Sequence, residues 1–207
     1  MIFNLPNTLT ILRMVFVPIF LVLLFSFPKT VYGITAALVV FIAASLTDLY
    51  DGRIARQRKQ ETNFGKVMDP LADKLLVLSA FVSFVQMDLI PGWMVVVISA
   101  RELVVTSVRM FALSQGKVMA SISSGKHKTA WQIAVIIEII LVAWFQRAFD
   151  LVKTPGMLKE LVTLQGTGSD IGVAALLMSP YFFTLVVASI SLFSAWDLLR
   201  KNRLLFS

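Results

Sequence analysis

The sequence has no cysteine, only one histidine (His127), and few charged residues for its length. The absence of cysteine excludes a disulfide framework, a cysteine nucleophile and a thiolate metal site. A single histidine argues against a histidine-rich zinc site. Charged residues make up 15% of the 207 residues and hydrophobic residues 57%, and the mean hydropathy is +0.82. A soluble domain of this length cannot hide so much apolar surface, so the composition indicates an integral membrane protein.

Apolar segments recur along the chain, each of roughly the length needed to cross a bilayer. They predict an all-α, polytopic membrane protein with six transmembrane helices and a short N-terminal interfacial segment. The first segment is not followed by a small-residue cleavage site, so we expect it to be retained rather than removed as a signal peptide. Residues 1–207 are taken as one membrane domain, with spans at about 14–27, 31–55, 66–87, 93–113, 126–145 and 173–198.

The net charge of +7 is distributed unevenly between the two predicted sides. Six spans place both termini on one side, and the loops on that side hold Arg53, Arg56, Arg58, Lys59, Lys66, Lys117, Lys126, Lys128, Arg200, Lys201 and Arg203. The opposite loops hold Lys29, Arg147, Lys153 and Lys159. Basic residues favour cytoplasmic loops, so we expect the termini in the cytoplasm. Nucleic-acid binding explains this charge less well, because the charges flank apolar segments.

Two pairs of aspartates border the second and third spans. Asp48 and Asp51 are three residues apart, and Asp69 and Asp73 are four apart, so on helices each pair shares one face. Four carboxylates gathered at a membrane edge repel one another and are costly to desolvate unless cations lie between them. Magnesium prefers carboxylates completed by substrate phosphates, so the pattern predicts a site for two Mg²⁺ ions, with Mn²⁺ as the alternative metal.

With the residues between them, these aspartates form the pattern D-x-x-D-G-x-x-A-R-x8-G-x3-D-x3-D. The pattern resembles the signature of the CDP-alcohol phosphotransferase family, membrane enzymes of phospholipid synthesis. The resemblance implies metal ligation by all four aspartates, with Asp73 also acting as the catalytic base, and a homodimer. It also implies a CDP-diacylglycerol site, for which our candidates are Gly52, Ala55, Arg56, Thr62, Gly65, Asn7 and Thr10.

The segments NLPNTLTILR (4–13) and GKHKT (125–129) further resemble the branch whose acceptor is glycerol 3-phosphate. The expected reaction transfers the phosphatidyl group of CDP-diacylglycerol to that acceptor and releases CMP, at the bacterial inner membrane. An acceptor with its own phosphate needs a second cationic pocket, and our candidates are Arg109, Lys126 and Lys128. The general excess of basic residues in cytoplasmic loops explains Lys126 and Lys128 equally well.

Other interpretations remain open. The aspartate motif does not distinguish among acceptor alcohols, such as inositol phosphate or serine, or a cardiolipin-forming reaction. An ion-coupled transporter also places carboxylates in the membrane, although usually near the midplane between repeats, and no repeat is found here. A membrane scaffold leaves the four acids unexplained. Arg101 and Glu102 lie deeper in a predicted span. For these two residues we favour a structural role, with Glu138 of the fifth span as the partner of Arg101.

Overall fold

The computed structural model describes residues 5–26, 30–58, 63–114, 124–149 and 170–201. Within these ranges, only the backbone is described at 5–10, 48–58, 63–71, 73, 109, 113–114, 124–128 and 170–171. The described residues form helices, with a described turn at 87–91, and contain no strand. The helices are α1 (Leu5–Ser26), α2 (Val31–Arg58), α3 (Asn63–Gln86), α4 (Gly92–Ser114), α5 (Ser124–Ala148) and α7 (Asp170–Lys201).

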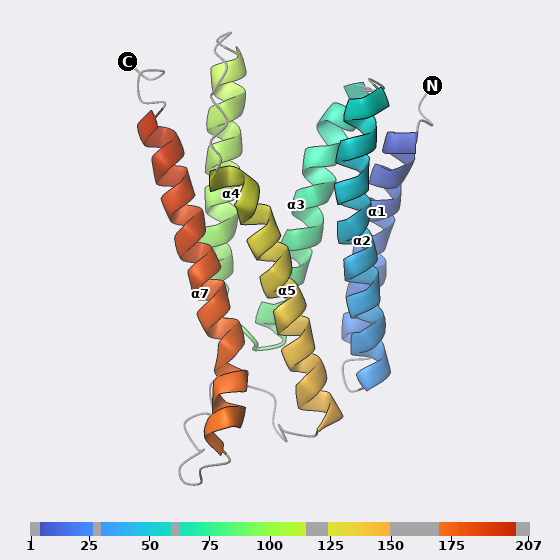
Figure 1. Cartoon of the computed structure of the whole chain (residues 1–207), viewed down its shortest axis with the longest axis vertical. Coiled ribbons are helices and arrows are strands. Elements are labelled where there is room, and N and C mark those ends of the chain that lie inside the picture. The colour runs from blue at the N-terminus through green and yellow to red at the C-terminus, as the bar shows by residue number, and fades with distance from the viewer. Residues whose placement is uncertain (1–4, 27–29, 59–62, 115–123, 150–169, 202–207) are drawn as a thin grey trace.

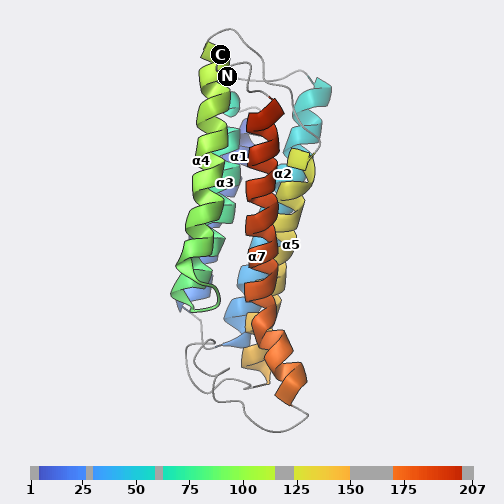
Figure 2. The ribbon, with the colours of Figure 1, turned by 90° about the vertical axis from the view of Figure 1, so that its left-hand side faces the viewer.

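The helices run roughly along one common axis and form an elongated bundle (Figures 1 and 2). α1 packs against α2 and α3, α4 packs against α3 and α7, and α5 packs against α2, α3 and α7. The junction of α2 with α3, the end of α4, the end of α7 and the start of α1 lie toward the same end of the bundle in both views. We call this end, at the top of both figures, the motif end.

The main core lies where α1, α2, α3 and α5 meet. Large rings fill part of it: Phe20 of α1 and Phe41 of α2 have centroids 5.7 Å apart, and Phe81 and Phe84 of α3 are fully buried. Alanines occupy other buried positions of α2 and α3, at Ala37, Ala44, Ala72 and Ala80. Small side chains let helix backbones approach closely, which is how helices associate when water does not drive their packing.

α1 begins before the span that the sequence predicted at about residue 14. Residues 5–13, which belong to the predicted N-terminal interfacial segment, are continuous with the apolar part of the helix. The helix begins at Leu5, with Pro6 in its first turn, where the missing N–H of proline breaks no intrahelical bond. Arg13 then lies inside the bundle, with 1% of its surface exposed.

Large apolar side chains cover much of the described surface of the bundle, and several polar side chains lie inside it. Serines and threonines such as Ser83, Thr184 and Ser191 are buried, whereas large apolar side chains such as Val96, Leu103 and Phe193 are at least 66% exposed. In the described residues, Thr129–Ala148 and Gly172–Lys201 are long and apolar enough to cross a membrane. α1, α2 and α3 contain shorter apolar stretches, Ile11–Ser26, Val31–Thr47 and Lys74–Gln86.

Candidate active site

The four aspartates of the motif lie on two helices that meet at the motif end. Asp48 and Asp51 are in the last three turns of α2, and Asp69 and Asp73 are in the first three turns of α3. The backbone is helical at all four positions, so each pair shares one helix face as the spacing predicted. Because α2 ends and α3 begins at the same end of the bundle (Figure 1), the fold brings the two pairs to one region.

This arrangement fits divalent metal ions in its donor chemistry. Each helix presents two carboxylates one turn apart, and carboxylate oxygens are the donors that Mg²⁺ prefers. The structure describes the backbone that carries these four residues rather than their side chains. Metal binding by these residues therefore stays a prediction.

The candidates for the CDP-diacylglycerol site lie on the same elements. Gly52, Ala55 and Arg56 follow the first aspartate pair on α2, and Gly65 precedes the second on α3. Asn7 and Thr10 lie in the first turns of α1, at the motif end. Thr62 lies outside the described residues. The backbone thus brings six of the seven candidates toward the aspartates, and their side-chain contacts stay a prediction.

The candidates for the acceptor phosphate lie on two further helices. Arg109 is in the last two turns of α4, and Lys126 and Lys128 are in the first two turns of α5. α4 runs toward the motif end and α5 runs away from it (Figure 2), so these segments occupy the part of the bundle nearer the motif end. The backbone is compatible with the predicted convergence, and the side chains of these residues are not described.

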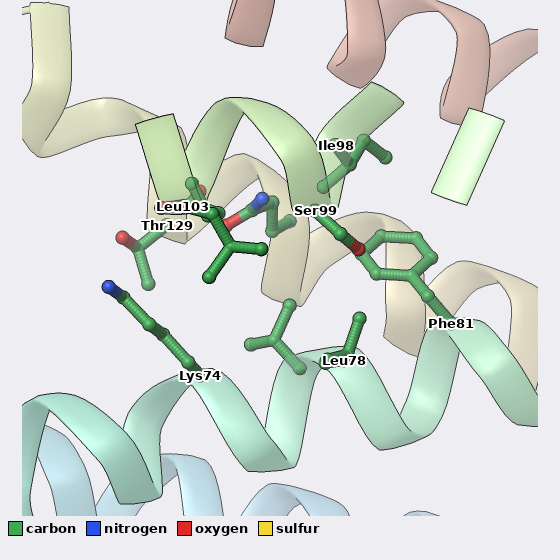
Figure 3. Close-up of a pocket in the computed structure, with 10 residues that line it drawn as sticks. Lys74, Leu78, Phe81, Ile98, Ser99, Leu103 and Thr129 are labelled. Carbon is green, nitrogen blue, oxygen red and sulfur yellow. The ribbon is translucent and has the colours of Figure 1, made fainter. Parts of the chain in front are cut away.

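A cavity of about 130 Å³ lies between α3, α4 and α5, further from the motif end than the segments that carry Arg109, Lys126 and Lys128. Its described lining is mixed: Lys74, Ser99, Glu102, Thr129 and Gln132 are polar, and Val77, Leu78, Phe81, Ile98 and Leu103 are apolar. Figure 3 shows Lys74 and Thr129 at one end of the cavity, and Phe81 and Ile98 at the other. Lys74 directly follows Asp73, and Thr129 directly follows Lys128, so the polar end adjoins two of the predicted site residues.

Lys74 also links the helices that border this cavity. Its Nζ donates a hydrogen bond to Thr106 Oγ1, which joins α3 to α4. Thr106 is three residues before Arg109, so the two residues share a face of α4. The bond therefore fixes the part of α3 that carries Asp73 relative to the part of α4 that carries Arg109.

The charges within the predicted spans pair differently from our expectation. Arg101 does not bond to Glu138. Its Nε donates to Ser191 O at 3.0 Å, its Nη2 donates to Ser194 Oγ at 2.9 Å, and its Nη1 lies 3.4 Å from Glu102 Oε1. Glu138 instead accepts a hydrogen bond from Ser179 Oγ of α7. Both residues therefore connect a neighbouring helix to α7, as a structural role requires.

Sequence reasoning did not single out the polar residues of the cavity as parts of a site. Gln132 reads as an ordinary position of a span, and Thr129 entered only as the last residue of the GKHKT segment. The spacing of Lys128 and Gln132, four residues apart on one helix, is the available signal for Gln132. Because the predicted span at about 126–145 contains both residues, this spacing indicates a shared helix face.

Comparisons with known proteins agree with the motif. The profile of the CDP-alcohol phosphatidyltransferase family matches residues 3–164. The chain is 41% identical to the CDP-diacylglycerol–glycerol-3-phosphate 3-phosphatidyltransferase of Bacillus subtilis, over 74% of this chain and 83% of the relative. It is 37% identical to the protein of the same name from Escherichia coli, over 67% and 77%. A probable phosphatidylglycerophosphate synthase of Mycobacterium tuberculosis is 39% identical, over 67% and 66%. This chain therefore belongs to the CDP-alcohol phosphatidyltransferase family.

Proposed function

We propose that this chain transfers the phosphatidyl group of CDP-diacylglycerol to sn-glycerol 3-phosphate, forming phosphatidylglycerol phosphate and releasing CMP. The observation that carries this proposal is the similarity to relatives named for that reaction, at 37–41% identity over two thirds or more of the chain. The complete aspartate motif on two adjoining helix ends supports it independently.

The proposed setting is a bacterial inner membrane crossed by six helices, with the termini and the active site on the cytoplasmic side. The buried serines and the exposed large apolar side chains support contact with lipid. Two stretches meet the length and hydropathy needed for spanning, and shorter apolar stretches lie in α1, α2 and α3. The orientation follows from the basic residues that flank the motif end.

We propose that Asp48, Asp51, Asp69 and Asp73 hold two Mg²⁺ ions, with Mn²⁺ as a substitute. When bound, such ions neutralise the pyrophosphate and stabilise the departing CMP. Their removal by EDTA should stop CMP release, and added Mg²⁺ should restore it. Tight binding of Mg²⁺ should also raise the melting temperature of the protein without substrate, because a ligand that binds only the folded state stabilises it.

Residues of the chain supply the proton acceptor, the space for the nucleotide and a cationic contact to it. Asp73 accepts the proton of the attacking hydroxyl, as the resemblance implies, and needs only to lie within hydrogen-bond reach of it. Gly52 and Ala55 leave room for the nucleotide to approach α2 closely, because neither has a large side chain. Arg56 offers a guanidinium to the pyrophosphate or to the nucleotide.

The acceptor alcohol distinguishes this reaction from the other reactions of the family. Purified protein supplied with CDP-diacylglycerol and Mg²⁺ is assayed for CMP release with glycerol 3-phosphate, inositol phosphate, serine and phosphatidylglycerol in turn. Glycerol 3-phosphate should give the highest kcat/KM. A higher value with another alcohol would assign the chain to a different reaction of the family. Ion transport without CMP release from any acceptor would instead favour the transporter interpretation.

A further inference from the structure

The cavity between α3, α4 and α5 has a polar end without an assigned role. Its volume of about 130 Å³ far exceeds the 10–15 Å³ that one water molecule needs, so a small molecule fits. We propose that this polar end binds the glycerol hydroxyl of the acceptor that the reaction does not consume, with Gln132 as the residue that recognises it. This inference rests on the proposed function, since it concerns the acceptor of that reaction.

The first observation is the buried amide of Gln132. The residue is 4% exposed and lines the cavity, and among the described residues its Nε2 has no hydrogen-bond partner. Buried side-chain amides in native proteins nearly always have a partner, so an unsatisfied one next to a cavity points to a ligand. Rotation of the amide by 180° would place Oε1 there, and a hydroxyl suits either atom because it both donates and accepts.

The helical register is the second observation. Gln132 lies four residues after Lys128 and therefore one turn further from the motif end on the same face of α5. Glu102 lies seven residues before Arg109 on α4, which is two turns on one face. The polar end of the cavity thus continues the two helix faces that carry the candidates for the acceptor phosphate.

The chemistry of the acceptor matches this layout. Glycerol 3-phosphate has a phosphate on C3, an attacking hydroxyl on C1 and one spare hydroxyl on C2. If the basic candidates Arg109, Lys126 and Lys128 bind the phosphate and the C1 hydroxyl lies at Asp73, the C2 hydroxyl is the group that remains to be recognised. Gln132, which is buried and lines the cavity, supplies an amide to it.

The apolar end of the cavity limits the size of the acceptor. Phe81 and Ile98 lie at this end and offer no hydrogen bond, and the Ser99 hydroxyl beside them already donates to Val95 O. A larger polyol that extended into this end would bury hydroxyl groups against apolar side chains and lose their hydration. The cavity therefore favours a three-carbon acceptor over a ring such as inositol phosphate.

The test compares two acceptors: glycerol 3-phosphate and 3-hydroxypropyl phosphate, which lacks only the C2 hydroxyl. At saturating CDP-diacylglycerol, the wild type should prefer glycerol 3-phosphate by about three- to tenfold in kcat/KM, as expected for one neutral hydrogen bond. Gln132→Met keeps an unbranched side chain of similar size and removes the amide, so it should lose this preference. Its melting temperature without substrate should stay equal or rise, because the unsatisfied amide is gone.

Gln146→Met is the matched control. Gln146 lies on the same helix, about 21 Å further along, and its Nε2 also has no partner among the described residues. This variant should keep the full preference. Thr129→Val, which removes a hydroxyl at the same end of the cavity, is the second variant if Gln132→Met does not fold.

The possible outcomes distinguish a failure of the cavity assignment from a failure of the proposed function. If the wild type prefers glycerol 3-phosphate and the folded Gln132 and Thr129 variants keep that preference, the cavity assignment is wrong and the proposed function stands. An equal loss in Gln146→Met also overturns the assignment, because the effect would not be local. If the wild type transfers to neither acceptor, the proposed function fails and the inference falls with it.

Discussion

Arg101 illustrates how single polar residues hold this bundle together. Its guanidinium reaches a backbone carbonyl and a hydroxyl of α7 and lies near the carboxylate of Glu102 on its own helix. Only 8% of the residue is exposed. A buried arginine with several partners is costly to disturb, because each hydrogen bond to a charged group contributes more than a neutral one.

We therefore predict that Arg101→Met destabilises the protein by about 1.5–3 kcal/mol, the contribution of one hydrogen bond to a charged group, or more if several are lost. Thermal unfolding in detergent measures this. Lys201→Met is the control, because Lys201 pairs with Asp197 at 3.1 Å on an exposed face and should contribute only about 0–1 kcal/mol. Equal melting temperatures for the two variants would contradict the assigned role of Arg101.

The four motif aspartates give the second prediction at this scale. Replacement of Asp48, Asp51, Asp69 or Asp73 by Asn keeps the shape of the side chain and removes the charge that holds the metal. Each variant should lose nearly all transfer activity. Each should also fold as well as the wild type without metal, because one of several repelling charges is gone. Near-normal turnover in any two of the four would refute the proposed two-metal site.

The third prediction concerns the phosphate of the acceptor. Arg109→Ala and Lys126→Ala should each weaken the apparent affinity for glycerol 3-phosphate by roughly ten- to a hundredfold, because a charge-assisted hydrogen bond is lost. The saturation curve for CDP-diacylglycerol should not change. If the lipid curve shifts and the acceptor curve does not, these residues belong to the nucleotide or lipid side of the site.

At the scale of elements, the turn between α3 and α4 sets how these two helices meet. α3 is followed by a turn in which Asp88 adopts the left-handed conformation, with a φ of 57°. The N–H of Leu89 donates to the carbonyl of Phe84 at 2.9 Å, and that of Asp88 to the carbonyl of Val85 at 3.0 Å. This is the Schellman arrangement, which satisfies the last carbonyls of a helix.

We predict that Asp88→Val destabilises the protein by about 1–2 kcal/mol, because a β-branched side chain is strained at positive φ. Asp88→Asn should be nearly neutral, since asparagine tolerates this conformation. Melting temperatures of the two variants provide the measurement. A destabilisation in Asp88→Asn as large as that in Asp88→Val would show that the carboxylate matters more than the backbone.

Much at this scale follows from local sequence, and the remainder depends on packing. Apolar runs bounded by polar residues predicted a helix in each expected range, and spacing alone placed each aspartate pair on one face. Two expectations failed for different reasons. The first predicted span, from about residue 14, is too short because the N-terminal segment before it continues the same helix from Leu5. The pairing of Arg101 with Glu138 was wrong because the face that each helix turns toward α7 depends on how the helices pack.

The cavity beside α5 was not predictable for the same reason. Lys74, Glu102 and Gln132 come from three helices, and no spacing in the sequence brings them together. Neither apolar periodicity nor motif matching detects an unsatisfied amide. The aspartate motif was predictable because all its residues lie within one hairpin of helices, α2 and α3.

At the scale of the whole molecule, the bundle places the α2–α3 junction and the start of α1 at one end, and the start of α7 at the other (Figures 1 and 2). We predict that residues 59 and 153, both outside the described residues, lie on opposite sides of the membrane. The chain has no cysteine, so Lys59→Cys and Lys153→Cys each give a single labelling site. A membrane-impermeant maleimide should label position 59 only from the cytoplasmic side and position 153 only from the other. Labelling of both from one side would contradict the six-span topology.

The homodimer that the family resemblance implies is also a property of the whole molecule. It stays a prediction, and light scattering of the protein in detergent should give twice the mass of one 23.0 kDa chain after subtraction of the detergent. A mass of one chain would contradict the dimer and leave the proposed reaction unaffected.

The central claim is the transfer of a phosphatidyl group to glycerol 3-phosphate. Its most direct test supplies purified protein with CDP-diacylglycerol, Mg²⁺ and isotopically labelled glycerol 3-phosphate, and measures CMP and the labelled lipid together. The proposed reaction predicts one labelled phosphatidylglycerol phosphate for each CMP released, and neither product with Asp69→Asn. Release of CMP without label in the lipid, or no reaction with glycerol 3-phosphate, would contradict the claim.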